Sequence, residues 1–277
     1  MTQFEIDKLI VNYNLEKHGF QIIKGVFTSE QIHNMRLAIK KTFLKLEKLN
    51  LLETSVSKHY NFSGTLAGVI QQELEEFDYI IFNKSYLEAV KSLIGPDIAY
   101  IEDSSMQIGT GYTGYHKDNV SRTDANHSDW KSNYDVIRGG LYFQNTKDYS
   151  GGISIRAGSH KHADLFSGKP IIAPLEEGDI IFWKLTTTHS GNAKRLKLFP
   201  NIPLLGRVQR FLPKWFFIAE QIERMALFAT FGKPGTHLDA YENYSRSRKD
   251  NFTRKNSNYS NKCRELAKLN NVILKEY

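Results

Sequence analysis

The sequence predicts a mainly β protein with flanking helices, built as a sandwich or barrel, and three observations favour this class. Short apolar runs broken by Gly, Asn, Asp and Pro follow one another from Ile98 to about Gly232. Before this region, apolar residues recur at helical intervals instead. Hydrophobic residues make up 40% and aromatic residues 12% of the 277 residues, which is enough for a sizeable core. All-β domains approaching this length commonly fold as one unit, so we expect a single domain over residues 1–277.

The N-terminal part, residues 1–97, is expected to be rich in helix. A turn at Gly19 leads into a short strand. Thr28 and Gln31 then have the spacing of a capping box, which marks the start of a helix. A second helix is expected from Lys84 to Leu93. The apolar residues that share one face of the first helix are Ile32, Met35, Ile39, Phe43 and Leu46.

The β core is expected over residues 98–232, and residues 233–277 form a C-terminal extension. The strand-like runs are IAYIEDSSMQIG, RGGLYFQN, GGISIRAGSH, KPIIAPLEEGDIIFWKL and ERMALFATFG. Their spacing is typical of a sandwich or barrel. The extension is polar and basic, and we expect it to form helix or to wrap the surface.

Composition excludes several classes of protein. Cys263 is the single cysteine, so neither an intramolecular disulfide nor a thiolate metal cluster can form, and a reducing cytoplasm fits best. The first twenty residues contain early acids and no long apolar run, which predicts neither a signal peptide nor a membrane span. The net charge of +7 could attract an anionic partner, although an excess of this size more often serves solubility.

A candidate metal site starts in the segment TGYHKDNVSR, where His116 and Asp118 lie two positions apart. A second histidine, His189, stands near the end of the apolar strand in GDIIFWKLTTTHSGN. Two histidines and one carboxylate form a facial triad, the ligand set that leaves positions open on non-haem Fe(II). The ordinary readings stay open: a surface turn for the first pair, and a hydrogen bond at a strand end for His189.

The segments YHKD, GGISIRAGSHKH and GDIIFWKLTTTHSGN resemble the His-x-Asp, hairpin and distal-histidine segments of the phytanoyl-CoA dioxygenase-like family of Fe(II)/2-oxoglutarate oxygenases. HGFQIIKGVFTSEQI and YLEAVKSLIGPD extend the similarity, in matching order, over roughly residues 18 to 232. The resemblance implies a single oxygenase domain with a double-stranded β-helix core, a cupin-like jelly roll. It also implies that His116, Asp118 and His189 bind Fe(II) at the open end, with 2-oxoglutarate and O₂ as co-substrates.

A cation that holds the distal carboxylate of 2-oxoglutarate is also implied, and arginine suits a planar carboxylate. The sequence departs from the family here, because NAKRLKLFPNIPLLGRVQRFLPKW follows the distal histidine. We assign the role to Arg224, which opens the strand RMALFATFG, and treat residues 193–222 as an insertion. Arg195 is the rival, with a solvated loop cation as its alternative reading, but a rigid strand holds a carboxylate better than a loop. Gln107, on the strand before the metal loop, is a second candidate contact to the co-substrate, and an outward-facing polar strand residue is its equal alternative.

The substrate side is less defined by the sequence. Tyr115, Asn119 and Trp183 flank or approach the ligands and are candidates for the substrate pocket, with core packing as the alternative for Trp183. Ser159 and His160, in the hairpin, are expected to form a structural turn.

The reaction that the resemblance implies is decarboxylation of 2-oxoglutarate coupled to hydroxylation of a C–H bond. Asp118 argues against halogenation, because related halogenating enzymes carry a small residue at that place. Desaturation, epoxidation and ring formation stay open, since the pose of the substrate decides among them.

The inserted segment offers a hint about the substrate. Residues 193–219 contain six Lys or Arg and no Asp or Glu, interleaved with large apolar residues. This pattern predicts a lid for an acidic substrate or a peripheral contact with an anionic membrane, with a packed loop as the alternative. The working hypothesis is a small-molecule, lipid-linked or glycan-linked substrate that carries negative charge.

Two other classes of protein stay open. A cupin-type metal protein that is not an oxygenase, such as an isomerase or a binding module, would bind metal without consuming 2-oxoglutarate. A nucleic-acid binder would fit the pI of about 9.2 and the basic tail YSRSRKDNFTRKNSNYSNK. No recognised binding motif accompanies this charge, so we rank nucleic acid last among the partners.

Overall fold

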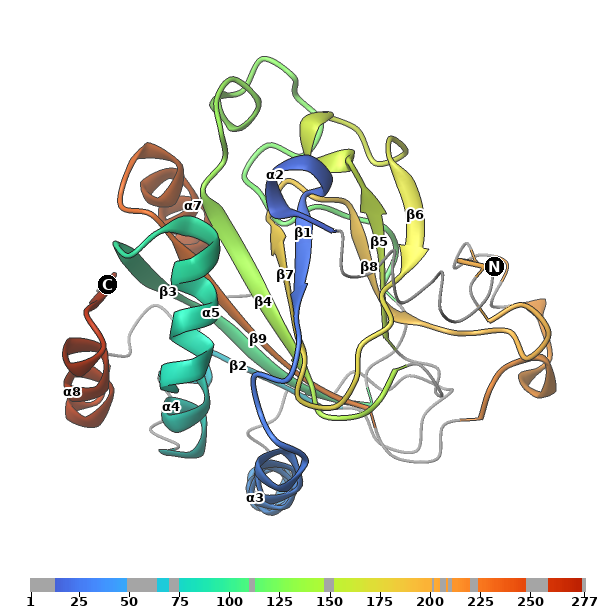
Figure 1. Ribbon diagram of the computed structural model, residues 1–277, viewed down its shortest axis with the longest axis horizontal. Helices are drawn as coiled ribbons and strands as arrows, with labels where there is room; N and C mark the ends of the chain where they lie inside the picture. Colours follow the sequence, from blue (N-terminus) through green and yellow to red (C-terminus); the bar gives the residue numbers. More distant parts are fainter. Residues whose placement is uncertain are drawn as a thin grey trace.

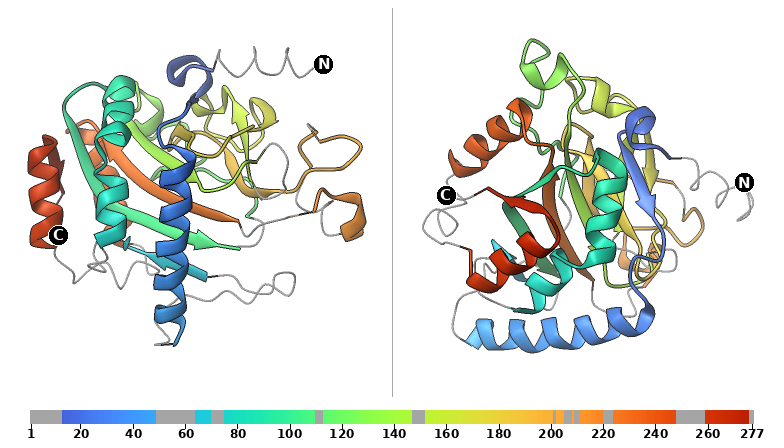
Figure 2. Two further views of the ribbon diagram at one scale, coloured as in Figure 1. Left: turned by 60° about the horizontal axis from the view of Figure 1, so that its bottom comes forward. Right: turned by 60° about the vertical axis from the view of Figure 1, so that its left-hand side comes forward.

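Two β-sheets face each other in the computed structural model, and helices cover the outer face of the larger sheet (Figures 1 and 2). The larger sheet has the strand order β1-β7-β4-β9-β3-β10, with β2 on β3, and the smaller has the order β6-β5-β8. The prediction of a mainly β jelly roll with flanking helices is confirmed. The structure describes residues 13–48, 64–69, 75–109, 113–146, 152–200, 202–204, 208, 211–219, 224–247 and 259–275.

Along the described part of the chain, the α-helices precede residue 98 or follow residue 232, and most of the strands lie between these two groups. The strands are β1 (Phe20–Ile23), β2 (Gly64–Ala67), β3 (Ile98–Ile108), β4 (Val136–Tyr142), β5 (Gly152–Ala157), β6 (Lys169–Ile172), β7 (Ile180–Lys184), β8 (His189–Ala193), β9 (Met225–Gly232) and β10 (Val272–Leu274). The α-helices are α2 (Leu15–His18), α3 (Ser29–Lys48), α4 (Glu75–Ile81), α5 (Lys84–Ile94), α7 (Thr236–Ser247) and α8 (Asn261–Leu269). Short 3-10 turns are η2 (Ser128–Trp130), η3 (Ser159–Lys161) and η4 (Lys214–Phe216).

The helix starts follow local sequence signals. At the start of α3, the backbone N–H of Thr28 donates to Gln31 Oε1 (2.8 Å) and that of Gln31 donates to Thr28 Oγ1 (3.2 Å), so the predicted capping box is confirmed. The side chain of Asn83 caps α5, which ends before Gly95, within one residue of the prediction. The apolar face predicted for α3 is buried at Ile32, Ile39, Phe43 and Leu46 and partly buried at Met35.

Strand alternation divides the core into two layers. On β7, Ile180 and Phe182 pack with the helices, whereas Ile181 and Trp183 pack between the two sheets. Arg138 on β4 lies opposite Trp183 in the register, so its side chain also enters the space between the sheets. The inner face of the larger sheet is therefore where polar side chains can meet inside the jelly roll.

Backbone hydrogen bonds connect the loop between β3 and β4 to the start of β8. His116 and His189 form an isolated bridge, in which each backbone N–H donates to the carbonyl of the other at 2.9 Å. The backbone N–H of Asp118 donates to the carbonyl of Leu185 (2.9 Å). These backbone bonds hold segments that are far apart in sequence in one place.

The C-terminal extension returns to the core. The helices α7 and α8 agree with the predicted helix or wrapping, but β10 was not predicted: Val272, Ile273 and Leu274 pair in parallel with β3. A strand of three residues is too short to show an alternating pattern in the sequence, so β10 is recognisable only from its pairing with the edge of β3. The strand β10 joins this last segment to the main sheet. The single domain over residues 1–277, with its parts bounded at residues 97 and 232, stays a prediction.

Residues 194–219 are defined here as the basic arm; its described residues (194–200, 202–204, 208 and 211–219) follow β8 and are drawn at the right of Figure 1. An isolated bridge joins Leu196 to Phe217, and the backbone N–H of Ile218 donates to the carbonyl of Arg195 (2.9 Å). The predicted insertion at 193–222 begins one residue before the arm, at Ala193, which still belongs to β8. Its last residues, 220–222, lie outside the described ranges.

Candidate metal centre and its cavity

His116, Asp118 and His189 come together in the folded chain. One ligand atom from each lies within 4.8 Å of the others. Asp118 Oδ1 is 3.6 Å from His116 Nε2, and Asp118 Oδ2 is 3.4 Å from His189 Nε2. The side chains of Asp118 and His189 are 9% and 7% exposed, whereas that of His116 is 32% exposed. The centre is thus buried on one side and reachable on the other.

The backbone orients both imidazoles. His116 Nδ1 lies 2.7 Å from the carbonyl oxygen of Gly114, and His189 Nδ1 lies 3.1 Å from that of Thr187. A carbonyl oxygen only accepts, so each Nδ1 carries the proton and each Nε2 presents its lone pair. This arrangement is typical of histidines that bind metal through Nε2.

The protonation states also suit a ligand set. Burial lowers the pKa of His189 to about 4, so its imidazole is neutral at pH 7. Burial alone would raise the pKa of Asp118, but the neighbouring His189 and Arg138 outweigh that effect and hold it below its usual value. A neutral imidazole and an ionised carboxylate are the forms that bind a divalent cation.

A buried ion-pair network stands behind Asp118. Arg138 donates to Asp118 Oδ2 (3.3 Å), to Asp103 Oδ2 (2.5 Å) and to the carbonyl oxygen of Asp103 (2.7 Å). The hydroxyl of Tyr241, on α7, donates to the same Asp103 carboxylate. Sequence analysis missed these three residues, although a charged residue inside the apolar run of β4 was a signal that could have found Arg138.

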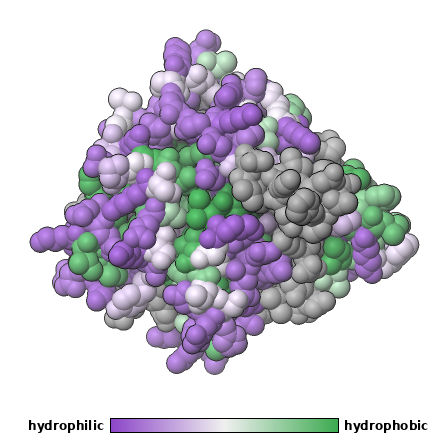
Figure 3. All heavy atoms as spheres, viewed as in Figure 1, coloured by the Kyte–Doolittle hydropathy of each residue, from purple (hydrophilic) through white to green (hydrophobic). Residues whose placement is uncertain are grey.

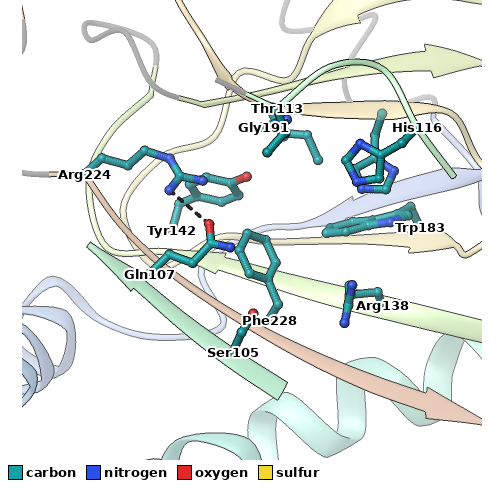
Figure 4. A pocket seen from close by; sticks show the side chains of 12 residues that line it. Ser105, Gln107, Thr113, His116, Arg138, Tyr142, Trp183, Gly191, Arg224 and Phe228 are labelled. Atoms are coloured by element: carbon teal, nitrogen blue, oxygen red, sulfur yellow. Dashed lines mark hydrogen bonds between the residues drawn. The ribbon is translucent and has the colours of Figure 1, made fainter. Parts of the chain in front are cut away.

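A cavity of about 100 Å³ opens beside the candidate metal centre (Figure 4). His116, His189 and Trp183 line one part of it, and Arg224 and Gln107 line another. Arg224 Nη1 lies 3.4 Å from Gln107 Oε1, shown by the dashed line in Figure 4. The prediction thus named two side chains, one on β3 and one directly before β9, that meet in this cavity.

A buried donor in this cavity lacks a partner: the indole N–H of Trp183 makes no hydrogen bond among the described residues. Burial raises the pKa of the Tyr142 hydroxyl, and the guanidinium of Arg224, 5.5 Å from the centre of the Tyr142 ring, opposes this rise. A buried donor without a partner costs free energy, so a polar ligand or water at this place would satisfy it.

Arg195 lies away from the cavity at the candidate metal centre and is not among its lining residues. It is 7% exposed, its Nη1 donates to the carbonyl of Thr146 (2.7 Å) and its Nε donates to that of Pro200 (3.0 Å). The interpretation of Arg195 as a solvated loop cation was wrong, because the side chain is buried where the basic arm begins.

The three residues predicted for the substrate pocket lie in different places. Trp183 is 1% exposed and belongs both to the core between the sheets and to the cavity wall. Tyr115 lies outside the lining, with its hydroxyl 2.6 Å from Ser154 Oγ. Asn119 is fully buried and donates to Asp129 Oδ2 (2.7 Å), so it shapes the loop and does not line this cavity.

Lys117, between two of the candidate ligands, fixes the loop. Its ammonium is fully buried and donates to the carbonyls of Ser159 (2.8 Å) and Thr186 (2.5 Å). Ser159 and His160 lie in η3, the turn that the sequence predicted, and the hydroxyl of Ser159 accepts the backbone N–H of Thr188 (2.9 Å). The loop and the hairpin hold each other.

The donor set fits a divalent metal ion with open coordination positions. Two imidazoles and one carboxylate supply three ligands, and His116 and His189 border the cavity, so further positions would face it. The cationic and amide groups of Arg224 and Gln107 suit a small carboxylate across that cavity. The arrangement can therefore hold a metal ion and a small anion together.

No protein-family model matches the chain, and no curated protein matches it significantly. The resemblance to the phytanoyl-CoA dioxygenase-like family therefore stays a prediction at the level of the family. Solved structures, in contrast, match over most of the chain.

The structures that it resembles are non-haem, 2-oxoglutarate-dependent enzymes. The epimerase SnoN from nogalamycin biosynthesis aligns with a TM-score of 0.57 at 12% identity, over 84% of each chain. The carbocyclase SnoK from the same biosynthesis gives 0.54 at 14% identity, again over 84% of each. HygX from Streptomyces hygroscopicus, solved with nickel and 2-oxoglutarate, gives 0.51 at 12% identity, over 84% of this chain and 88% of HygX. At these identities the likeness establishes the fold.

Proposed function

We propose that this protein is an Fe(II)/2-oxoglutarate-dependent dioxygenase that hydroxylates a C–H bond of a small molecule. One observation carries the proposal: the His116, Asp118 and His189 cluster borders a cavity that also contains Arg224 and Gln107. The fold shared with SnoN, SnoK and HygX supports it.

The roles follow from position. His116, Asp118 and His189 would bind Fe(II), and Arg224, with Gln107, would hold the distal carboxylate of 2-oxoglutarate. Iron, 2-oxoglutarate and O₂ together supply the oxidising chemistry. The packed ring of Trp183 keeps bulk water from one wall of the cavity.

The reaction outcome is the finer part of the proposal. The similar structures include an epimerase and a carbocyclase, so this fold supports several outcomes. We favour hydroxylation because Asp118 keeps the full ligand set that halogenating relatives lack. Desaturation, epoxidation and ring formation depend on the substrate pose, and a product analysis by mass spectrometry would separate them from hydroxylation.

The test is an anaerobic titration of Fe(II) and 2-oxoglutarate into the metal-free protein. A weak visible charge-transfer band should appear in wild type and disappear in His116→Ala. Arg224→Met should weaken 2-oxoglutarate binding by at least about tenfold, because a charge-assisted bidentate contact is lost. Arg195→Met is the matched control. This arginine of the same region donates to the backbone carbonyls of Thr146 and Pro200, and its loss should leave the affinity within about twofold.

The opposite result would favour a different class of protein. A folded, iron-loaded wild type without the band would leave a cupin-type metal protein that is not an oxygenase, an isomerase or a binding module. A loss of affinity in Arg195→Met with none in Arg224→Met would reverse the assignment of the arginines.

We propose a small-molecule substrate, lipid-linked or glycan-linked and negatively charged. SnoN has been solved with nogalamycin RO and HygX with hygromycin B, so related folds accommodate sizeable small molecules. A negative charge on the substrate would suit the basic arm. Succinate release across a panel of acidic and neutral candidates would test this, and turnover of neutral candidates alone would contradict it.

The basic arm further supports a peripheral contact with anionic membranes. Exposed apolar side chains gather on the arm, at the right edge of Figure 3, and they include Phe211 (86%), Leu198 (80%) and Trp215 (68%). Six cations and no acids lie among them in sequence. Apolar anchors within a cationic segment match the chemistry of an anionic bilayer surface. No helix in the described ranges is long and apolar enough to cross a membrane.

Vesicle co-sedimentation tests the arm. Wild type should bind vesicles of mixed anionic and neutral lipids better than neutral ones, and Phe211→Ser with Trp215→Ser should lose this binding. Leu269→Ser, which removes a side chain 78% exposed on α8, is the matched control. Equal, negligible binding to both vesicles would remove the membrane contact and leave a lid or a packed loop as the role of the arm; the proposed location would then be cytoplasmic alone.

Nucleic acid stays the least supported partner. The basic segment 248–258 lies outside the described ranges.

A further inference from the structure

A second cavity, of about 410 Å³, lies against the loop that carries His116 and Asp118. It lies between α2, η2, η3 and the end of β7, at the top of Figure 1, and shares no lining residue with the cavity at the candidate metal centre. Lys117 reaches toward this side of the loop, with its ammonium 5.1 Å from the centre of the Trp130 ring. We define this as the loop cavity; none of the roles proposed above uses it.

Buried polar atoms without partners are concentrated in its lining. The hydroxyls of Tyr134 and Thr186 make no hydrogen bond to the part of the chain that the structure describes, although these residues are 3% and 0% exposed. Asp129 Oδ1, at 2% exposure, and His160 Nδ1 also have no hydrogen-bond partner there. Asp129 Oδ1 lies 3.3 Å from His127 Nδ1, but that nitrogen accepts the backbone N–H of Asp129. Four buried groups of this lining would therefore gain from partners outside the described residues.

The charges around the loop cavity balance within the protein. Lys184 is 3% exposed and bonds to Glu16 Oε1 (2.8 Å) and Asn133 Oδ1 (2.7 Å). The other oxygen of Asp129 already accepts from Asn119 Nδ2 (2.7 Å) and Ser121 N (3.2 Å). With Lys161 the lining carries two cations and two carboxylates, so no excess of either sign selects an ion.

The remaining groups favour a ligand rich in hydroxyls. Tyr134 Oη and Thr186 Oγ1 can each donate and accept, and Asp129 Oδ1 can only accept. A hydroxyl group both donates and accepts, so several hydroxyls on one ligand would satisfy this mixture. The indole of Trp130 lines the same cavity and offers an apolar surface, which suits the C–H face of a sugar ring.

We propose that the loop cavity binds a neutral polyhydroxylated ligand, a sugar or polyol unit, separately from the candidate metal centre. Asp129 accepts a hydroxyl of the ligand, and Tyr134 and Thr186 bond to its oxygens. The proposal does not depend on the proposed oxygenase function, because neither iron nor 2-oxoglutarate takes part.

The experiment is calorimetric titration of the full-length, metal-free protein with EDTA present. The probes are the methyl glycosides of glucose, mannose and galactose, N-acetylglucosamine and myo-inositol, each up to about 50 mM. At least one probe should bind saturably to wild type, and Tyr134→Phe and Thr186→Val should each weaken it by about tenfold, the loss expected for one hydrogen bond. Tyr142→Phe is the matched control, because it removes another buried tyrosine hydroxyl, which lines the other cavity, and it should leave the affinity unchanged.

Three outcomes would overturn the proposal. Absence of saturable binding for every probe would mean that water alone fills the cavity. Binding that both variants retain would place the ligand elsewhere on the protein. The two variants preserve side-chain shape and remove groups without partners, so their melting temperatures should equal or exceed that of wild type. A marked fall in either would show that the hydroxyl already has a partner in the protein, which removes the premise.

Discussion

Replacing Arg138 with methionine should destabilise the metal-free protein, because two buried carboxylates would lose their shared cation. The guanidinium lies 2.5 Å from Asp103 Oδ2 and 3.3 Å from Asp118 Oδ2. The three side chains are 14%, 3% and 9% exposed, so water screens them poorly. Methionine has a similar length and no charge, so the substitution tests the charge more than the packing.

The burial of these three side chains sets the expected loss in the free energy of unfolding. Removing one partner of a buried ion pair costs about 3–5 kcal/mol, because a charge is left without compensation. Asp103 keeps the hydroxyl of Tyr241 as a hydrogen-bond donor, which offsets part of the cost, so we expect the lower end of that range. In a chain of this size each kcal/mol lowers the melting temperature by about 2–4 °C, so Arg138→Met should melt about 6–12 °C below wild type. A divalent ion bound to Asp118 would supply positive charge and recover part of the loss.

The assay is thermal unfolding followed by circular dichroism, with EDTA and with excess Ni(II). Lys84→Met is the control, because Lys84 and Glu88 form a surface pair with side chains 84% and 63% exposed, and its melting temperature should stay within about 2 °C of wild type. A shift of Arg138→Met no larger than that control in EDTA would refute the reasoning about the network. An equal shift with and without Ni(II) would show that Arg138 is not coupled to metal binding at Asp118.

Three further predictions concern single groups. Gly178→Ala should lower the melting temperature more than Gly25→Ala. Both glycines have positive φ (89° and 60°), but a Cβ at Gly178 would lie 2.0 Å from the carbonyl oxygen of Phe27, whereas the space at Gly25 is open. Equal shifts of the melting temperature would contradict this. Burial lowers the pKa of His189 to about 4 in the folded, metal-free protein, against about 6.5 in the unfolded chain. The unfolded chain therefore binds more protons between these values, and the free energy of unfolding should fall by about 3 kcal/mol as the pH drops from 6.5 to 4. Urea unfolding should show a smaller fall in His189→Gln, and an unchanged fall would assign it to other groups. Arg195→Met should make the basic arm more sensitive to limited proteolysis, because two bonds to backbone carbonyls are lost; an unchanged digestion pattern would mean that other contacts hold the arm.

Features that depend on neighbours in sequence were predictable. The capping box at Thr28 and the apolar period of α3 specify that helix, because side chains three and four residues apart share a face. Alternation and turn residues likewise indicated the strands of the core. His116 and Asp118 were recognisable as a pair because one short loop carries both.

The tertiary structure decided which distant groups meet. It brought His189 to the loop of His116, and it placed Arg224 in the cavity while turning Arg195 toward the base of the arm. Sequence patterns did not indicate that β3, β4 and α7 would assemble the network of Asp103, Arg138 and Tyr241. They also did not indicate β10.

The sequence by itself determined the class of fold, the limits of most core elements and a short list of chemically capable residues. The partners of each polar side chain depended on strand register and on the long connections that return segments to one another. A register shift of one residue would turn Arg138 to the other face of its strand without changing the local pattern. Local periodicity therefore encodes the elements, and the packing of the two sheets selects which of their charges share the interior.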